Sequence, residues 1–362
     1  MTSLSDLPLR ENLVGLRPYG APQDPVPVSL NVNENTHPIP EHVAIDIVQS
    51  LARAVTGVNR YPDREFMELR EALAGYLGHG LEANQIWAAN GSNEVLQQVL
   101  QAFGGPGRSL LSFTPTYSMY PLLASGTDTS WIAVERPADY ALTPEAVVEA
   151  LKEYRPDIVI LCGPNNPTGT PLERDVIEAA YDAFDGILIV DEAYHEFDAE
   201  RESAVTLLPG RPRLLVSRTM SKAFAFAGVR LGYLAADPAV IDALRLVRLP
   251  YHVSALTQAA ATAAVRHADS MLATVADIRA QRDRLAAALA ELGYVVHPSG
   301  SNFLLVGGFA DPDATFEALR AQGILIRNLS IPGHLRITAG TESETSTVIE
   351  AIRALGPGGA RS

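Results

Sequence analysis

The segment "SRTMSKAFAFAGVRLGY" (217–233) surrounds a single lysine, Lys222, with hydroxyl, alanine and phenylalanine side chains. Exposed lysines usually serve solubility, but apolar surroundings disfavour the ammonium form and lower the pKa of a lysine. The neutral amine that results can attack an aldehyde and form a Schiff base. Lys222 is therefore a candidate for holding an aldehyde cofactor, and pyridoxal phosphate offers such an aldehyde, with a dianionic phosphate and a ring nitrogen that must stay protonated.

The phosphate of such a cofactor requires hydroxyls, backbone N–H groups and a cation. Thr219, Ser221 and Arg230 lie in the same segment as the lysine. A second segment, "NGSNEVLQQV", places Ser92 and Asn93 at the start of a predicted helix, where free N–H groups and the helix dipole favour an anion. Taken alone, Ser92 and Asn93 are explained equally well as an ordinary helix start.

The ring of the cofactor makes three further demands. A carboxylate must keep the ring nitrogen protonated, and "LIVDEAYHEF" places Asp191 directly after an apolar strand, with Tyr194 three residues later. A flat side chain must cover one face of the ring, and Tyr117 of "FTPTYSMYP" is the candidate. Asn166 follows another apolar strand, in the turn "CGPNNPTGT". A capping carboxylate and a plain turn would account for Asp191 and Asn166 if each stood alone.

The composition limits the remaining possibilities. The chain has 362 residues, 47% of them hydrophobic, and a formal net charge of −14. Such a chain offers no basic face to nucleic acid or an anionic membrane, so any anionic ligand must meet locally placed arginines. The single cysteine, Cys162, excludes an intrachain disulfide, is expected to be a small buried residue and suits a cytoplasmic protein. We expect no signal peptide, transmembrane helix or metal site.

Alternating helices and short apolar strands must position these side chains. The runs "RSLLSF", "DIVILC", "GILIVD", "RLLVS" and "LGYLA" are typical of buried parallel strands, and amphipathic segments separate several of them. This alternation predicts an α/β fold, with a mostly parallel central sheet covered by helices on both faces. We expect an extended, proline-rich N-terminal arm (1–40), a large cofactor-binding domain (41–253) and a smaller α+β C-terminal domain (254–362). An alanine-rich helical stretch at 254–290 would connect the two domains.

Four motifs in order, "PTYSMY", "PNNPTGT", "VDEAYHEF" and "RTMSKAFAFAGVRLGY", make the chain resemble the fold-type I pyridoxal-phosphate enzymes, and among them the class II aminotransferases. The resemblance extends over about residues 31–350. It implies that Lys222 holds pyridoxal 5'-phosphate as a Schiff base and moves the proton during catalysis. It further implies that Asp191 pairs with the ring nitrogen, Tyr194 and Asn166 with the phenolic oxygen, and that Tyr117 stacks on the ring.

The resemblance also implies a phosphate site and a dimer. Tyr61 of "RYPD" would reach the phosphate of the neighbouring subunit's cofactor, so the working unit would be a homodimer. The phosphate-binding residues implied within one subunit are Ser92, Asn93, Thr219, Ser221 and Arg230.

Within this family the motifs are most similar to those of histidinol-phosphate aminotransferases, which exchange an amino group between L-histidinol phosphate and 2-oxoglutarate in histidine biosynthesis. The segment "ILIRNLSIPGHLRIT" places Arg327 and Arg336 near the ends of two predicted strands. A substrate with a phosphate in place of a carboxylate is well met by two guanidinium groups. Tyr19 and Asn33 match residues of the family that lie near the substrate, although an aromatic anchor for the arm explains Tyr19 nearly as well.

Other functions remain open at this point. An aromatic amino-acid aminotransferase would use Arg336 and have little need of Arg327, and a threonine-phosphate decarboxylase carries similar motifs. A non-catalytic regulator would have no need of the Lys222, Asp191 and Arg230 set. His195 departs from the family pattern, and we expect it to be packed or solvent-facing.

Overall fold

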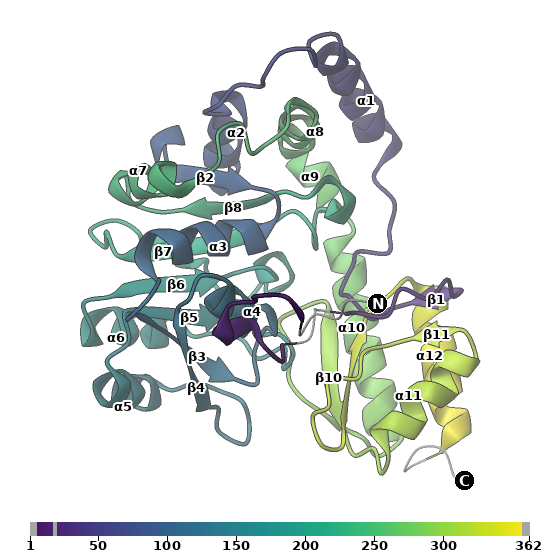
Figure 1. Ribbon diagram of the computed structural model, residues 1–362. Coiled ribbons are helices and arrows are strands. Elements are labelled where there is room, and N and C mark those ends of the chain that lie inside the picture. The colour runs from purple at the N-terminus through teal and green to yellow at the C-terminus, as the bar shows by residue number, and fades with distance from the viewer. Residues whose placement is uncertain (1–5, 17–19, 357–362) are drawn as a thin grey trace.

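A seven-stranded sheet forms the centre of the computed structural model, which describes residues 6–16 and 20–356 (Figure 1). The strand order is β2-β8-β7-β6-β5-β3-β4, and every neighbouring pair from β7 to β4 is parallel. Its strands are β2 (Ile86–Ala89), β3 (Ser109–Thr114), β4 (Ser130–Glu135), β5 (Ile158–Cys162), β6 (Ile187–Asp191), β7 (Leu214–Thr219) and β8 (Gly232–Ala235).

The prediction of a mostly parallel sheet is confirmed, with one correction. "LGYLA" forms β8, which runs antiparallel to both β7 and β2. An antiparallel neighbour needs only a short connection, and residues 220–231 join β7 to β8 without a crossover helix. The pattern of apolar runs also missed β2 and β4, which are strands of the same sheet.

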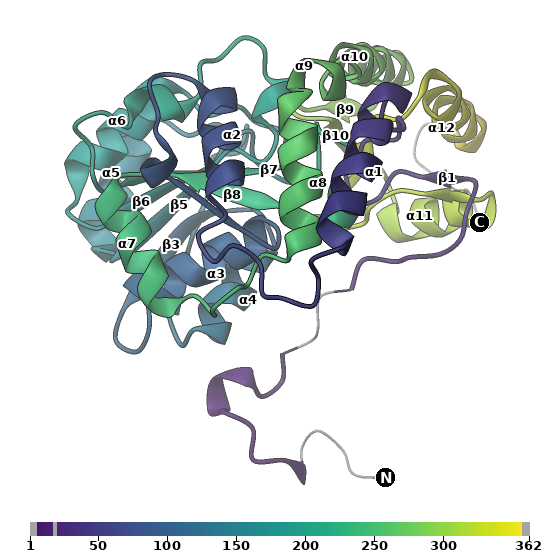
Figure 2. The same ribbon diagram turned by 90° about the horizontal axis from the view of Figure 1, so that it is seen from above.

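Helices cover both faces of this sheet, as expected for strands that are apolar on both sides. Figure 2 shows α3 and α4 on one face and α2 and α6 on the other. The helices of this part are α1 (Glu41–Val55), α2 (Met67–Leu77), α3 (Ser92–Phe103), α4 (Met119–Gly126), α5 (Pro144–Tyr154), α6 (Arg174–Ala183), α7 (Pro238–Val247) and α8 (Ala255–Arg266).

A second, smaller core lies beside the first. Its antiparallel sheet has the order β12-β10-β9, and helices α10 and α12 pack together next to it (Figure 1). The elements are α9 (Ala268–Met271), α10 (Val275–Glu291), β9 (Val295–Val296), β10 (Phe303–Gly307), α11 (Pro312–Ala321), β11 (Ile324–Leu325), β12 (His334–Thr338) and α12 (Glu342–Leu355). The helical stretch at 254–290 is thus three helices rather than one.

The packing of α8 does not fit a domain boundary at residue 254. Helix α8 follows that residue but packs on α1 and α2, and its buried alanines belong to the larger core. Packing on the second core begins with α10. We therefore propose that, by packing, the smaller domain starts after α8.

Residues 28–30 of the arm lie on this second core, whereas Arg10 and Asn12 donate to the Gly126 and Ser125 carbonyl oxygens at the end of α4. Strand β1 (Val28–Ser29) pairs in parallel with β11, and Val28 and Leu30 are buried in the smaller core. The next residues contact the segments that follow β6 and β7, where Asn33 donates to the Tyr194 hydroxyl and the Val32 carbonyl oxygen accepts from Lys222. Among the described residues, no helix combines the length and apolar character needed to span a bilayer.

Candidate active site

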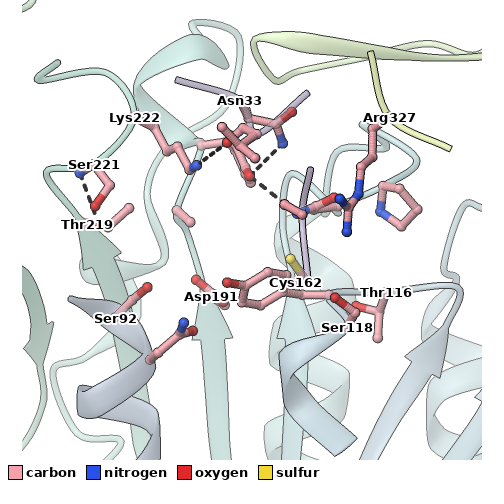
Figure 3. Close-up of a pocket in the computed structure, with 18 of the residues that line it drawn as sticks. Asn33, Ser92, Thr116, Ser118, Cys162, Asp191, Thr219, Ser221, Lys222 and Arg327 are labelled. Atoms are coloured by element: carbon pink, nitrogen blue, oxygen red, sulfur yellow. Dashed lines mark hydrogen bonds between the residues drawn. The ribbon is translucent and has the colours of Figure 1, made fainter. Parts of the chain in front are cut away.

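A cavity of about 700 Å³ opens where the parallel strands β3, β5, β6 and β7 end. Carboxyl ends of parallel strands are where open α/β sheets place their ligand groups. Figure 3 shows labelled side chains from strand ends, from a helix start and from the arm turned toward one space. The predicted residues that line it are Asn33, Ser92, Asn93, Tyr117, Asn166, Asp191, Tyr194, Thr219, Ser221, Lys222, Arg230, Arg327 and Arg336.

Lys222 lies in the turn after β7, and its Nζ donates a hydrogen bond to the Val32 carbonyl oxygen at 2.7 Å. Burial lowers the pKa of the Lys222 ammonium to about 8, and the positive charges of Arg336 and Arg230 act in the same direction while Glu34 opposes them. A lysine with a lowered pKa has a larger share of its neutral, nucleophilic amine near pH 7. The burial of Lys222 in the fold therefore gives a physical cause for the lowered pKa that its sequence surroundings predict.

Asp191 is the last residue of β6 and is 3% exposed. Its Oδ2 accepts a hydrogen bond of 2.7 Å from the Tyr120 hydroxyl, whereas its buried Oδ1 has no hydrogen-bond partner among the described residues. Burial raises the pKa of Asp191 to about 6, although Tyr120 and the Ala193 N–H oppose the shift. A buried carboxylate with one unsatisfied oxygen is suited to a cationic N–H donor from a ligand.

Two glycines let β8 and its preceding loop approach the start of α3. A Cβ on Gly91, which has a φ of +87°, would lie 2.5 Å from Nη2 of Arg230. A Cβ on Gly232 would lie 2.1 Å from the backbone nitrogen of Ser92. Only glycine at both positions brings the Arg230 guanidinium against the N-terminus of a twelve-residue helix. A helix start beside a guanidinium is a favourable anion site.

The other predicted phosphate-binding residues meet at the same corner of the cavity. Thr219 ends β7, and its Oγ1 accepts a hydrogen bond from the Ser221 N–H at 3.1 Å (Figure 3). The side-chain oxygen of Asn93 is buried and has no hydrogen-bond partner within the described chain. Hydroxyls, helix N–H groups and a guanidinium are thus gathered here although they come from two separate segments of the chain.

A hydrogen-bonded network joins the arm, the large sheet and the smaller sheet. The Tyr194 hydroxyl accepts from Nδ2 of Asn33 at 2.9 Å and from Nδ2 of Asn166 at 3.3 Å. Nη1 of Arg336 donates to Oδ1 of Asn166 at 2.7 Å, and Thr338 Oγ1 donates to Oδ1 of Asn33 at 2.9 Å. Asn33 has a φ of +59°, so its backbone is held in the left-handed region by contacts on several sides.

The two arginines of the smaller domain are neighbours in space. Backbone hydrogen bonds of 3.0 and 2.9 Å join Arg327 and Arg336 as an antiparallel bridge, and both side chains line the cavity. Arg336 lies in the middle of β12, not at a strand end, and Arg327 lies beyond the end of β11. The expectation that each arginine lies at a strand end was therefore wrong. The bridge nevertheless places both guanidinium groups at one cavity.

Two predicted or discussed residues, Tyr61 and His195, lie elsewhere, and a third is not described by the structure. Tyr61 is 80% exposed and stacks on Tyr251, with ring centroids 4.5 Å apart, and it does not line the cavity of its own chain. Tyr19 lies outside the described residues. His195 is partly buried, faces away from this cavity, and burial lowers its pKa.

Three groups at the site were not predicted from the sequence. Tyr120 donates to Asp191 but does not line the cavity, and only its position three residues after Tyr117 in the same motif pointed to it. The Val32 carbonyl has no sequence signal at all, because any residue supplies one. Cys162 is buried as expected, yet its side chain reaches the cavity wall; burial raises the pKa of this thiol to about 12, so it stays neutral.

Comparison with known proteins gives this geometry a family. Residues 25–352 match the family described as aminotransferase class I and II. The chain belongs to this family. Because the match covers most of the chain, the class I and II aminotransferase fold accounts for the sheet, the smaller domain and the cavity between them.

Two similar proteins of the aminotransferase class I and II family carry the same name. A protein of Paenarthrobacter aurescens, named histidinol-phosphate aminotransferase, is 60% identical over 97% of this chain and 96% of its own length. One of Thermobifida fusca with the same name is 54% identical over 97% and 96%.

Solved structures agree on the fold. The histidinol-phosphate aminotransferase of Sinorhizobium meliloti, solved with pyridoxal-5'-phosphate, superposes with a TM-score of 0.81 at 24% identity, covering 91% of this chain and 92% of the other. The aspartate aminotransferase of Thermus thermophilus, solved with maleate, has a TM-score of 0.78 at 26% identity, covering 90% and 92%. The fold is therefore that of fold-type I aminotransferases.

Proposed function

We propose that this protein is a pyridoxal-phosphate-dependent histidinol-phosphate transaminase. It exchanges the amino group between L-histidinol phosphate and 2-oxoglutarate, giving imidazole acetol phosphate and L-glutamate, in L-histidine biosynthesis. The observation that carries the proposal is a cavity with two separate anion-binding corners. In Figure 3, Ser92, Thr219 and Ser221 lie on one side of Asp191, and Arg327 lies on the other.

The residues at the first corner fit pyridoxal 5'-phosphate. The unsatisfied Asp191 Oδ1 suits a protonated ring nitrogen, and Gly91 leaves the space in which Arg230 approaches the helix start. When bound, the cofactor supplies an electron sink that stabilises negative charge on the substrate carbon. We propose that it is held by Lys222, Asp191 and a group that comprises Ser92, Asn93, Tyr117, Asn166, Tyr194, Thr219, Ser221 and Arg230.

Each residue then has a definable task. Lys222, with its lowered pKa, binds the cofactor through Nζ and afterwards accepts and returns the proton that moves during amino transfer. Asp191 keeps the ring nitrogen protonated, because a buried anion favours a cation beside it. Tyr194 and Asn166, which are hydrogen-bonded to each other, orient the phenolic oxygen of the cofactor. Tyr117 covers a ring face and excludes water from it.

The second corner favours a phosphate-bearing substrate over a carboxylate alone. The protein has a net charge of −14, yet three arginines and a lysine line one cavity. Two guanidinium groups, on Arg327 and Arg336, suit the dianionic phosphate of histidinol phosphate, and Arg336 alone suffices for the carboxylate of glutamate. Asn33 holds Tyr194 beside this corner. An aromatic amino-acid substrate carries no phosphate for Arg327 to bind.

A spectral half-reaction tests the proposed function. The protein loaded with pyridoxal phosphate is mixed with histidinol phosphate in the absence of an acceptor. We expect the visible absorbance of the loaded protein to disappear and to return when 2-oxoglutarate is added. If only phenylalanine or tyrosine produced the change, the aminotransferase assignment would stand and the histidinol-phosphate assignment would be wrong.

Arg327→Ala is expected to raise the KM for histidinol phosphate about 10- to 100-fold, because hydrogen bonds between a guanidinium and a phosphate are lost. The half-reaction with glutamate should change little. The backbone bridge to Arg336 does not depend on the side chain, so the fold should persist. Arg320→Ala is the control, since Arg320 forms an exposed ion pair with Asp24 away from the cavity. An equal loss with both substrates would contradict the role given to Arg327.

A homodimer is part of the proposal. Ile45, Val48 and Val55 are more than half exposed and share one face of α1, and Val58 and Tyr61 follow them with 56% and 80% exposure. Such an apolar surface is typical of an interface. A second copy would cover it, and Tyr61 would then reach the phosphate of the partner's cofactor. We propose a cytoplasmic location, which the buried free thiol of Cys162 suits.

A heterodimer of two defective subunits tests the role of Tyr61. Tyr61→Ala is expected to lower activity about tenfold and Lys222→Ala to remove nearly all of it. If Tyr61 acts across the interface, a heterodimer of these variants contains one complete site and should show about half of the wild-type activity. Purification through two different affinity tags isolates this species. Activity near one twentieth of wild type would mean that Tyr61 acts within its own subunit, and an unchanged rate in the Tyr61→Ala homodimer would mean that it does not act at the site.

A further inference from the structure

The hydroxyl of Tyr120 holds one oxygen of Asp191 and leaves the other available. Tyr120 lies in the first turn of α4, is completely buried, and donates to Asp191 Oδ2 at 2.7 Å. It does not line the cavity, so it cannot touch a substrate there. The second oxygen, Oδ1, is buried and has no hydrogen-bond partner among the described residues. One carboxylate thus has two oxygens with different surroundings.

The ring of Tyr120 is fixed independently of its hydroxyl. It meets the Tyr117 ring edge-to-face, with centroids 5.5 Å apart and an interplanar angle of 88°. Edge-to-face packing of buried aromatic rings is favourable and directional. The hydroxyl therefore approaches Asp191 from a direction that the protein sets, and one residue connects the carboxylate with the proposed ring-covering tyrosine.

Few other ionisable groups act on this pair. The Cys162 thiol on β5 is buried and neutral, and Glu192 follows Asp191 in the chain. Arg136, after β4, donates to the Phe113 and Tyr140 carbonyl oxygens and contributes positive charge near Tyr120 and Cys162. Among the described residues, the Tyr120 hydroxyl is the side-chain donor to the Asp191 carboxylate.

We propose that Tyr120 is a positioning residue that orients Asp191 Oδ1 toward the ring nitrogen of the cofactor and keeps the carboxylate ionised. The inference rests on the proposed function. A hydroxyl that donates to a carboxylate stabilises its charged form, and the charged form in turn holds the proton on the ring nitrogen. Without this donor, the proton shifts toward the carboxylate and the electron sink weakens.

Tyr120→Phe removes the hydroxyl and keeps the ring against Tyr117. We expect the affinity of the apo-protein for pyridoxal phosphate to fall about tenfold or more, because a hydrogen bond to a charged group is lost. With cofactor labelled by ¹⁵N at the ring nitrogen, the resonance of the bound form should move from the pyridinium position toward that of unprotonated pyridine. The kcat should fall about tenfold or more while the KM for histidinol phosphate stays within about twofold, since Tyr120 is absent from the cavity wall.

Tyr294→Phe is the matched control. Tyr294 is 6% exposed and donates its hydroxyl to the Gly356 carbonyl oxygen at 3.1 Å in the smaller domain. Its removal should leave affinity and ¹⁵N shift unchanged. A Tyr120→Phe protein with the wild-type shift and affinity would overturn the inference, as would the same shift change in both variants. If the wild-type protein failed to bind pyridoxal phosphate, the proposed function would fall and this inference with it.

Discussion

Replacement of Lys222 by alanine is expected to lower the turnover of histidinol phosphate about 10⁴-fold. Lys222 is the nucleophilic amine of the cavity, and burial lowers its pKa to about 8. No other lysine can take over, because the chain contains only Lys152 and Lys222. Steady-state rates of wild type and variant give the ratio directly. A variant that retained more than about one tenth of the rate would contradict the assignment.

The covalent link gives this prediction a second readout. Borohydride reduction of the loaded wild-type protein should fix the cofactor on one peptide, and mass spectrometry should locate it at residue 222. The Lys222→Ala protein should carry none. Lys152→Ala is the matched control, since Lys152 lies on α5 at the surface. It should retain both the rate and the label. A label found on Lys152 of the wild-type protein would contradict the assignment of Lys222.

Replacement of Asp191 by asparagine is expected to lower kcat about 10²- to 10³-fold. The amide has nearly the same shape and can still accept from Tyr120, but it carries no charge to hold a proton on the ring nitrogen. Asp191→Glu keeps the charge and should lose less, although its longer side chain misplaces the oxygens. The comparison of kcat for the three proteins separates charge from shape. Equal losses in both variants would show that geometry alone matters.

The same asparagine variant should be more stable than wild type when no cofactor is bound. Burial raises the pKa of Asp191 in the folded protein to about 6 from 3.8, so the folded state binds this proton more tightly than the unfolded chain. The contribution of protonated Asp191 is therefore present below about pH 4 and lost as pH rises through about 6. At pH 8 the apo form of Asp191→Asn should gain about 3 kcal/mol in unfolding free energy.

Denaturant unfolding of both apo-proteins at pH 8 and pH 4 measures this difference. It should shrink toward zero at the lower pH, where the wild-type carboxyl is also neutral. A variant less stable than wild type at pH 8 would contradict the conclusion that burial of the ionised Asp191 carboxylate destabilises the apo-protein. If Asp191→Asn lowers activity but raises the stability of the apo-protein, the ionised Asp191 carboxylate destabilises the protein until the cofactor binds.

The sequence alone determined the parts of the site that depend on local order. Lys222, Thr219, Ser221 and Arg230 belong to one short segment, and Asp191 directly follows a strand, so type and spacing identified them. The sheet was predictable for the same reason. Apolar runs separated by amphipathic helices allow few arrangements other than a covered parallel sheet. The direction of β8 was missed because a short apolar run has no orientation in sequence.

Only the tertiary structure decided which groups from distant segments meet. Tyr120 bonds Asp191 across 71 positions of sequence, and Lys222 bonds the Val32 carbonyl across 190. A hydrogen bond between distant residues depends on the path of the chain between them, and neither partner carries a local mark of the other. The pKa values of Lys222 and Asp191 likewise follow from burial that the whole fold creates. Sequence thus supplied the chemical groups, and packing supplied their partners and their charge states.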